Sequence, residues 1–387
     1  MIERLIYIAA AREARRRGAA VAPRLMTFNI TNRCNAKCAM CEIHRWSASA
    51  GDEMDAARFG ELISDPMLRK LEVVRITGGE PFLHADLPGV VRILKKKLRG
   101  GVIYITTNGS MPGRVGPVVE AGSGGRAKLH VMVSLDSLDE THDRLRGVGG
   151  MLEKAKETVR SLAELKKKHD FYAGINQTVM KETLPHIDEV AGFARELGLG
   201  HHLFLGAQFH EGKEMKGENP LEKEMTFRPQ DGMTREEMES FYRRHAELKR
   251  DGAAAARRGG FRGAFLRELS EEYLNEGGRN RALEGRAAPK PPCMAMFTHF
   301  RLAPDGGVFP CSVFRNLSAG NIHGKSFSEI WKGPAAAEIR KKVISCKGCW
   351  IECDINPSVF YSGDIIPWYM SHFLKDREFR KHYLFIK

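Results

Sequence analysis

Six short apolar runs alternate with segments of helical periodicity, and this alternation limits what the chain can fold into more than any other feature. Strands are predicted at residues 25–30, 71–77, 102–107, 128–135, 172–180 and 202–209, with helices near 55–63, 86–98, 112–121, 151–168 and 184–197. Strands that alternate with helices lie parallel and are joined by right-handed crossovers. The pattern therefore predicts an α/β fold, either a partial (β/α)6 barrel or an open sheet.

Three cysteines, Cys34, Cys38 and Cys41, directly follow the first predicted strand. Neighbouring thiolates repel one another unless a cation gathers them, so thiols at this spacing predict a metal centre. Structural zinc takes four ligands and a cubane iron–sulfur cluster has four irons, so three cysteines either lack one ligand or leave one iron open. An open iron that binds a small chelating molecule is the working hypothesis. The alternative is a zinc knuckle in which His44 is the fourth ligand.

Polar side chains also lie on the other predicted strands or just after them. In parallel α/β folds the functional residues lie at the carboxyl ends of the strands. A Gly-Gly-Glu-Pro turn follows the second strand, and polar residues lie on or just after the third, fourth and fifth strands. These residues are Gly78, Gly79, Glu80, Asn108, Ser134, Asp136 and Asn176. Because the carboxyl ends of parallel strands meet at one edge of a sheet, we expect these residues to line a pocket beside the three cysteines.

A second group of cysteines lies far along the chain, at Cys293, Cys311, Cys346, Cys349 and Cys353. The sequence has no cysteine between the two groups, which indicates two modules, each with a metal site. In the second module a hairpin is predicted from residues 300–302 and 308–310 around an Asp-Gly-Gly turn. Short helices are expected near 327–331 and 335–343.

The composition of the remaining chain indicates three further segments, at the N-terminus, between the two cysteine groups and at the C-terminus. Residues 1–24 are expected to hold a basic amphipathic helix at 2–17, which either packs on the fold or docks on a membrane surface or substrate. Residues 210–292 read as a charged insertion and linker with a helix at 234–250. The predicted segments are therefore 1–24, the core at 25–209, the insertion at 210–292, the second module at 293–353 and an aromatic-basic amphipathic tail at 354–387.

The formal net charge of the 387 residues is +13. This basic excess suits anionic substrates, an acidic redox partner or a membrane surface, and by itself it does not indicate nucleic acid. The sequence shows no secretory signal and no apolar run long enough to span a bilayer, so a cytoplasmic protein is expected.

Taken together, the Cys-x3-Cys-x2-Cys motif after the first strand and the Gly-Gly-Glu-Pro turn after the second resemble the radical S-adenosylmethionine (SAM) superfamily over residues 25–209. The resemblance implies a partial (β/α)6 barrel in which Cys34, Cys38 and Cys41 hold a 4Fe-4S cluster and SAM chelates the fourth iron. It also implies reductive cleavage of SAM to a 5′-deoxyadenosyl radical, which abstracts a hydrogen atom from the substrate.

The same resemblance assigns residues to a SAM pocket. Gly78 and Gly79 would allow the backbone to approach the methionine part of SAM, and Glu80 would face its ammonium group. The other implied contacts, with the ribose, carboxylate or adenine of SAM, are Met40, Asn108, Ser134, Asp136 and Asn176. Met40 departs from the aromatic residue common at its position in the family, and Asn176 suits a substrate contact equally well.

The C-terminal module resembles the SPASM/twitch type of auxiliary-cluster domain, on Gly306, Cys311, the Gly320-Asn321 pair and the spacing of the last three cysteines. This resemblance implies a second, auxiliary 4Fe-4S cluster. A full SPASM domain has seven cysteines and two clusters, whereas five cysteines suffice for one fully ligated cluster. The first choice of ligands is Cys293, Cys311, Cys346 and Cys349, and Cys353 replaces one of them or stays free. A zinc ribbon is the alternative.

The expected protein is a radical SAM oxidoreductase or bond-forming enzyme that acts on a small-molecule or lipid precursor, with the auxiliary cluster aiding oxidation or bond formation. Only residues 1–24 precede the first strand, which leaves no N-terminal leader-binding domain and disfavours the alternative, a peptide-modifying maturase. A non-catalytic zinc or redox scaffold is the alternative from another class. The expected partners are a flavodoxin- or ferredoxin-type electron donor and, at the inner membrane face, a peripheral lipid contact, with no nucleic acid. The sequence names no catalytic acid or base.

Overall fold

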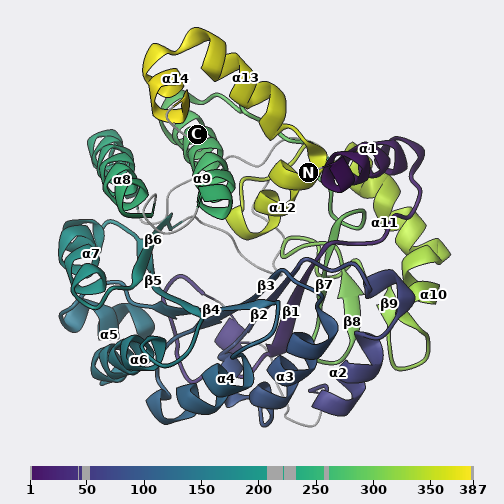
Figure 1. Cartoon of the computed structure of the whole chain (residues 1–387), viewed down its shortest axis with the longest axis horizontal. Coiled ribbons are helices and arrows are strands. Elements are labelled where there is room, and N and C mark those ends of the chain that lie inside the picture. The colour runs from purple at the N-terminus through teal and green to yellow at the C-terminus, as the bar shows by residue number, and fades with distance from the viewer. Residues whose placement is uncertain are drawn as a thin grey trace. The chain divides into compact units, whose positions relative to one another are not determined.

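The computed structural model describes residues 2–41, 43–45, 53–206, 221, 232–256 and 261–384 (Figure 1). The chain divides into two compact units. The sheet unit comprises Ala22–Glu214 and His299–Ile339, and the helical unit comprises Met1–Val21, Met215–Thr298 and Arg340–Lys387.

The sheet unit is built on parallel strands, as predicted. The strands are β1 Leu25–Thr31, β2 Val73–Gly78, β3 Val102–Thr107, β4 Lys128–Ser134, β5 Tyr172–Val179 and β6 Gly200–Leu205. They lie side by side in the order β6-β5-β4-β3-β2-β1, and each neighbouring pair is parallel. The α/β fold with a non-closed parallel sheet is confirmed. Residues 207–209 of the sixth predicted strand lie outside the described residues.

Helices connect these strands along one face of the sheet (Figure 1). They are α2 Ala56–Leu62, α3 Leu87–Lys97, α4 Val115–Ala121, α5 Glu140–Arg146, α6 Met151–Lys166 and α7 Ile187–Glu196. All were predicted except α5, which is only seven residues long. Asp139 caps its N-terminus by accepting a hydrogen bond from the Thr141 N–H, and Gly147 ends it in the left-handed conformation at φ +67°.

Alternation along the strands separates the two faces of the sheet. In β3, Ile103 and Ile105 are fully buried and Tyr104 between them is only half-buried. The apolar residues pack toward the helices, because burying their side chains against the amphipathic helices removes apolar surface from water. The strand register then brings one row of polar residues together on the opposite face: Arg301, Thr27, Arg75, Tyr104, His130 and Tyr172. We call this row the inner row.

The predicted C-terminal hairpin is confirmed, but it belongs to the core sheet. Strand β7 (His299–Leu302) pairs in parallel with β1, and β8 (Gly307–Phe309) and β9 (Gly320–Asn321) follow as antiparallel neighbours. The sequence indicated a separate second module, because a hairpin signal is local and does not show which strand edge it will join. Helix α10 (Phe327–Lys332) follows with a capping box between Ser326 and Glu329, and α11 spans Pro334–Ser345.

The helical unit contains both ends of the described chain. Its helices are α1 Ile2–Arg17, α8 Arg235–Ala256, α9 Phe261–Glu284, α12 Glu352–Ser362, α13 Ile365–Lys375 and α14 Arg377–Leu384. The prediction of a linker was wrong for residues 261–284. Their Ala, Arg and Gly content masked the buried residues Leu269, Tyr273 and Leu274, which pack one face of α9. Among the described residues, no helix combines the length and the apolar character needed to cross a bilayer.

Candidate metal centre and cofactor pocket

The loop that carries Cys34, Cys38 and Cys41 lies at the carboxyl end of β1, and the three thiols are half-buried and free of disulfides. It is clamped to the last turn of α5. The Lys37 N–H donates to the Arg146 carbonyl at 2.9 Å and the Ala39 N–H donates to the Leu145 carbonyl at 2.8 Å. The amides on both sides of Cys38 are therefore held by a helix that the sequence analysis missed.

Gly147 makes this clamp sterically feasible. A Cβ atom at Gly147 would lie 2.5 Å from the Lys37 carbonyl oxygen, and its φ of +67° is one that other residues rarely adopt. The cysteine loop can lie against the end of α5 only because this residue has no side chain.

Asn108 ties the same loop to the end of β3. Its Nδ2 donates to the Asn35 Oδ1 at 2.8 Å, and the Asn35 Nδ2 in turn donates to the Ser110 Oγ at 2.8 Å. The Asn108 Oδ1 accepts from the Ser110 N–H at 2.9 Å. The structure thus gives Asn108 a role in holding the loop, and its contact with SAM stays a prediction.

Gly78 and Gly79 lie against the backbone that leads to Cys34. The Gly79 N–H donates to the Thr31 carbonyl at 2.7 Å. A Cβ at Gly78 would fall 2.1 Å from the Thr31 carbonyl oxygen, and one at Gly79 would fall 2.0 Å from the Arg33 carbonyl oxygen. Both glycines are needed for this approach of chain to chain, a reason that is independent of the predicted approach to SAM.

Glu80 joins the ends of β2 and β3 from a buried position, 1% exposed. Its Oε1 accepts from the Thr107 Oγ1 at 2.6 Å and from the Phe82 N–H at 3.0 Å, while its Oε2 accepts from the Asn108 N–H at 2.7 Å. Burial raises the pKa of this carboxyl, against the opposing effect of the three hydrogen bonds. The structure shows that Glu80 stabilises the pocket wall by hydrogen bonds that join the turn after β2 to the end of β3. The expected contact with the SAM ammonium stays a prediction.

Asp136 is paired with an arginine that the sequence analysis did not single out. The Asp136 Oδ2 lies 2.6 Å from the Arg146 Nη2, and the side chain of Asp136 is fully buried. The Arg146 Nη1 donates toward the Cys38 Sγ at 3.8 Å. The carboxylate therefore faces a guanidinium that reaches the Cys38 thiol. Its contact with SAM stays a prediction. The signals that could have revealed Arg146 are the Asp139 cap and the Gly147 stop of α5.

Burial and neighbouring charges shift the pKa values around this loop. Burial raises the pKa of Cys34, and the charges of Cys38 and Glu80 act in the same direction, while Arg146 opposes them. Burial and the Arg146 charge lower the pKa of His142 to about 4. The Asp136 N–H donates to the Nδ1 of this neutral histidine at 3.2 Å. Thiolates here need a cation, which a bound cluster supplies.

Ser134, the last residue of β4, pairs with Asn176 within β5. Met40 is half-buried beside Cys41. Three buried amide oxygens at this edge of the sheet have no hydrogen-bond partner among the described residues: the Oδ1 atoms of Asn29, Asn32 and Asn176. A buried acceptor without a donor is costly, and SAM carries ammonium and ribose hydroxyl donors. On this observation the residues present fit SAM.

The C-terminal cysteines are divided between the two units. Cys293, Cys346, Cys349 and Cys353 belong to the helical unit, and Cys311 belongs to the sheet unit. Burial raises the pKa of Cys293 to about 12, and the charge of Cys346 acts in the same direction. Arg15 of α1 fixes this region by donating from Nε to the Cys293 carbonyl at 3.0 Å and from Nη2 to the Ile344 carbonyl at 3.2 Å. Cys353 is exposed.

In the part of the chain that the structure describes, no three His, Cys, Asp or Glu side chains converge on a position for a single metal ion. One zinc ion with bonds of about 2.3 Å would hold its thiolates about 3.8 Å apart. A cluster of several irons bridges more widely spaced thiolates. The absence of three converging ligands therefore applies to a site for a single metal ion and does not bear on a site for an iron–sulfur cluster.

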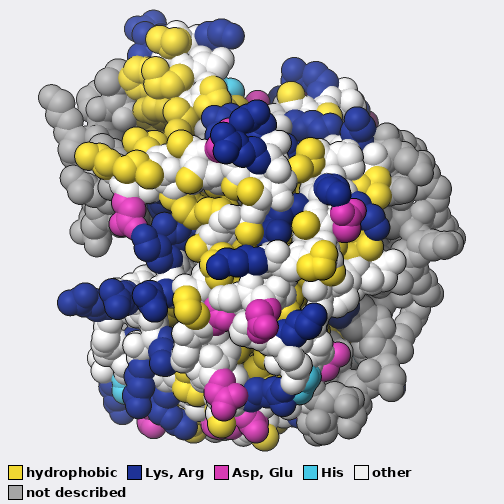
Figure 2. Space-filling model, turned by 90° about the vertical axis from the view of Figure 1, so that its right-hand side faces the viewer, with side chains coloured by type: hydrophobic (Ala, Val, Ile, Leu, Met, Phe, Trp, Pro, Cys, Tyr) yellow, Lys and Arg dark blue, Asp and Glu magenta, His cyan; other side chains and the backbone are white. Residues whose placement is uncertain are grey.

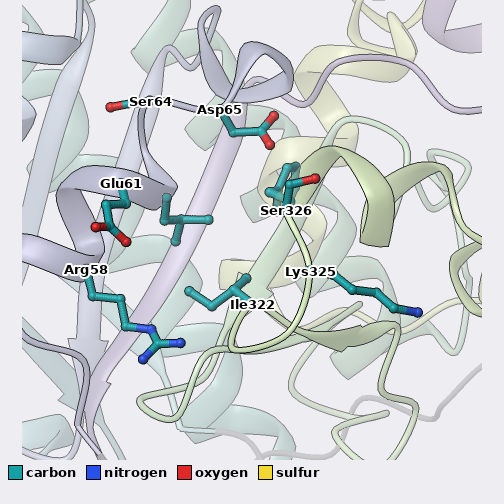
Figure 3. Close-up of a pocket in the computed structure, with 9 residues that line it drawn as sticks. Arg58, Glu61, Ser64, Asp65, Ile322, Lys325 and Ser326 are labelled. Atoms are coloured by element: carbon teal, nitrogen blue, oxygen red, sulfur yellow. The ribbon is translucent and has the colours of Figure 1, made fainter.

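A groove of about 350 Å³ lies elsewhere in the sheet unit, between α2 and the start of α10 (Figure 3). Arg58, Glu61 and Lys325 line it together with Asp65. The Asp65 carboxylate accepts hydrogen bonds from the Ser328 N–H and Oγ. None of the predicted site residues lines this groove. The polar groups of this groove join α10 to the core. The groove is separate from the cysteine loop, because no residue of that loop lines it.

Two family models match the chain. Residues 28–194 match the radical SAM superfamily, and residues 293–350 match the SPASM iron–sulfur cluster-binding domain. The second match begins at Cys293 and ends before Cys353.

Two curated proteins align along most of their length. An AdoMet-dependent heme synthase from Methanosarcina barkeri is 26% identical over 83% of this chain and 85% of its own. A pre-heme d1 synthase from Dinoroseobacter shibae is 25% identical over 84% of this chain and 77% of its own. Among solved structures, Streptococcus suis SuiB bound to S-adenosylmethionine has a TM-score of 0.54 at 17% identity, covering 82% of this chain and 68% of that protein. This structural likeness shows the fold.

Proposed function

This chain belongs to the radical SAM superfamily and carries a SPASM domain, and we propose that it is an oxidoreductase or bond-forming enzyme acting on an anionic small molecule. Membership of an enzyme superfamily removes the alternative of a non-catalytic zinc or redox scaffold. The superfamily uses SAM with a 4Fe-4S cluster, and the SPASM domain binds auxiliary iron–sulfur.

Cys34, Cys38 and Cys41 would hold the cluster, with the orphaned amide oxygens of Asn29 and Asn176 available to donors of SAM. When bound, SAM and the cluster supply a carbon-centred radical that removes a hydrogen atom from the substrate. The chain itself holds the cysteine loop from three sides: α5, the end of β3 and the turn at Gly79. A loop fixed in this way positions the reacting groups without further rearrangement.

The observation that carries the substrate proposal is the inner row. Arg75 and Arg301 lie in register on either side of Thr27, and His130 follows Tyr104 in the same row. Two guanidinium groups on the sheet face opposite the helices favour carboxylates or phosphates, which arginine binds with paired hydrogen bonds. Tyr172 extends the row and also donates or accepts at the His202 Nε2 at 2.9 Å.

The names of the two relatives agree with a small-molecule substrate. Both are synthases of heme-type molecules, and both align over more than four-fifths of this chain. A precursor of that type, or another polycarboxylate of similar size, is therefore the first substrate class to test. The preference for a small molecule over a peptide rests on these names and on the inner row.

The auxiliary site would contribute to the redox outcome. Cys293, Cys311, Cys346 and Cys349 are the proposed ligands, and Cys353 is the exposed remainder. Removal of one hydrogen atom leaves a substrate radical with an unpaired electron. A nearby electron acceptor would turn this step into a two-electron oxidation or allow a new bond to form.

The test uses anaerobically reconstituted protein, a chemical reductant and candidate substrates labelled with deuterium. Transfer of deuterium from a polycarboxylate small molecule into 5′-deoxyadenosine supports the proposal. Arg75→Met should raise the KM for that substrate about tenfold or more, whereas Arg99→Met, at an exposed position before β3, should leave it unchanged. Deuterium transfer from peptides alone would overturn the small-molecule proposal in favour of a peptide-modifying maturase.

Two partners are proposed besides the substrate. The basic excess of the chain suits an acidic electron donor of the flavodoxin or ferredoxin type. A lipid surface is the second, because the outward face of α1 is apolar in its first half, with Ile2 72% and Ile6 63% exposed. In the same unit α13 exposes Leu374 at 67%.

Helices α1 and α13 approach each other at Gly363. Ile8 of α1 and Ile366 of α13 both lie within 3.9 Å of the position that a Cβ on Gly363 would occupy. Exposed Arg12 and Arg16 continue the face of α1, and Figure 2 shows hydrophobic and basic side chains side by side on the surface. An apolar stripe next to basic residues suits the surface of an anionic bilayer.

A further inference from the structure

The guanidinium of Arg146 is a buried polar group that was not predicted as part of the site but contacts two residues that were. Its Nη2 lies 2.6 Å from the Asp136 Oδ2 and its Nη1 lies 3.8 Å from the Cys38 Sγ. Arg146 is 7% exposed and Asp136 is fully buried. The guanidinium therefore bridges a carboxylate and a thiol in a region with little water, where charges interact strongly.

Asp136 is itself fixed by β5. Its Oδ1 accepts from the Thr178 N–H at 3.0 Å, and its carbonyl oxygen accepts from the Gln177 Nε2 at 2.9 Å. Because both ends of the residue are held by the neighbouring strand, the carboxylate has one orientation, and it presents one oxygen to Arg146. The position of the guanidinium is thus set by the sheet.

The backbone at the end of α5 holds the same cysteine. The carbonyls of Leu145 and Arg146 accept from the amides of Ala39 and Lys37, which flank Cys38. Cys38 is therefore fixed through its two neighbours and through its sulfur by one helix end.

We propose that Arg146, held by Asp136, is a positioning residue that orients the Cys38 sulfur and raises the reduction potential of the SAM-binding cluster. This inference rests on the proposed role of Cys34, Cys38 and Cys41 as ligands of that cluster. A hydrogen bond to a ligating sulfur and a positive charge beside it stabilise the reduced, more negative state. Asp136 acts in the opposite direction, because its negative charge offsets part of the arginine charge.

The Arg146–Asp136 pair predicts shifts of the midpoint potential in opposite directions for two substitutions. Replacing the cation in Arg146→Met should shift the midpoint potential of the cluster to a more negative value. Asp136→Asn keeps the shape of the side chain but removes its charge, so the potential should shift to a more positive value. Arg146→Lys keeps the charge and should lie between wild type and Arg146→Met.

The measurement is a redox titration of the full-length reconstituted protein followed by electron paramagnetic resonance. The signal that changes when SAM is added identifies the cluster with the open iron, and this separates it from the auxiliary one. Arg24→Met is the matched control, because Arg24 is also a buried arginine paired with a carboxylate, that of Glu72 at 3.2 Å, and lies at the opposite end of β1 and β2. The midpoint potential of the cluster in Arg24→Met should equal that in wild type.

Equal potentials in wild type, Arg146→Lys and Asp136→Asn would overturn the inference, as would shifts of the two charge-removing variants in the same direction. Where Arg146→Met does not retain iron, Arg146→Lys and Asp136→Asn decide the outcome by themselves. A wild-type protein that gives no signal responsive to SAM would instead overturn the proposed function, so the two failures are distinguishable.

Discussion

The Glu80 carboxylate accepts a hydrogen bond from the Asn108 backbone N–H at 2.7 Å, across 28 positions of sequence. This contact joins the turn after β2 to the end of β3, and Asn108 then reaches the cysteine loop through Asn35. The pocket wall and the predicted cluster loop are therefore one hydrogen-bonded structure. Residues assigned to cofactor binding by their family motif also hold the pocket together, so substitutions there have two separable effects.

Glu80→Gln should lower the free energy of unfolding by about 2 kcal/mol, because an amide nitrogen would face a backbone N–H that now has no acceptor. The measurement is urea unfolding followed by circular dichroism. Glu61→Gln, on the exposed side of α2, should stay within about 0.5 kcal/mol of wild type. Equal stability of both variants would contradict the role of Glu80 as a brace.

Gly79→Ala should prevent the turn after β2 from packing on the chain that leads to Cys34, because the new Cβ would lie 2.0 Å from a backbone oxygen. We expect a lowered melting temperature together with loss of iron at the first site. Gly192→Ala in α7 is the control, since a Cβ there meets nothing within 4 Å. That variant should be as stable as wild type or more stable by up to about 1 kcal/mol. Full iron content in Gly79→Ala would count against the clamp.

Stability should rise with pH between about 4 and 6.5 because of His142. Its pKa in the folded protein is lowered to about 4, so the unfolded chain binds the proton more tightly over this interval. The contribution is fully present above the unfolded pKa of about 6.5 and is lost as pH falls toward 4, by about 3 kcal/mol in total. Urea unfolding at several pH values should show a smaller slope for His142→Gln, and an unchanged slope would refute the assignment.

The two C-terminal cysteines at positions 346 and 353 should differ in iron retention. Cys346→Ser should lose about four irons per chain, the content of one cubane cluster, because Cys346 is one of the four proposed ligands and lies within the matched SPASM segment. Cys353→Ser, at an exposed position after the matched SPASM segment, should keep them. Iron and sulfide analysis of reconstituted protein is the measurement. The reverse pattern would place Cys353 among the ligands.

Vesicle binding tests the exposed stripes of α1 and α13. Wild type should sediment with anionic vesicles more than with neutral ones, and Met370→Glu should weaken this binding about tenfold, because the residue is 48% exposed on the apolar face. Glu61→Gln serves again as a surface control. Binding that is equal for wild type and Met370→Glu would leave α13 without a part in membrane contact.

Much of the sheet was predictable because its signals are local. Each strand of the core is an apolar run bounded by polar or glycine residues, and the parallel arrangement follows from alternation with helices. Helix α5 escaped detection since seven residues give almost two turns and no clear periodicity. Helix α9 was missed for a different reason, because its composition resembles a linker and its buried face becomes visible only when packing partners are known.

The sequence by itself determined the superfamily, the α/β alternation and the cysteine triplet, because each is written in consecutive residues. Only the tertiary structure decided what surrounds the triplet. Arg146 lies 108 positions from Cys38, and β7 joins β1 across more than 260 residues of chain. Such contacts depend on burial and on hydrogen bonds that form only after the strands assemble, and no local pattern encodes the partner of a buried charge.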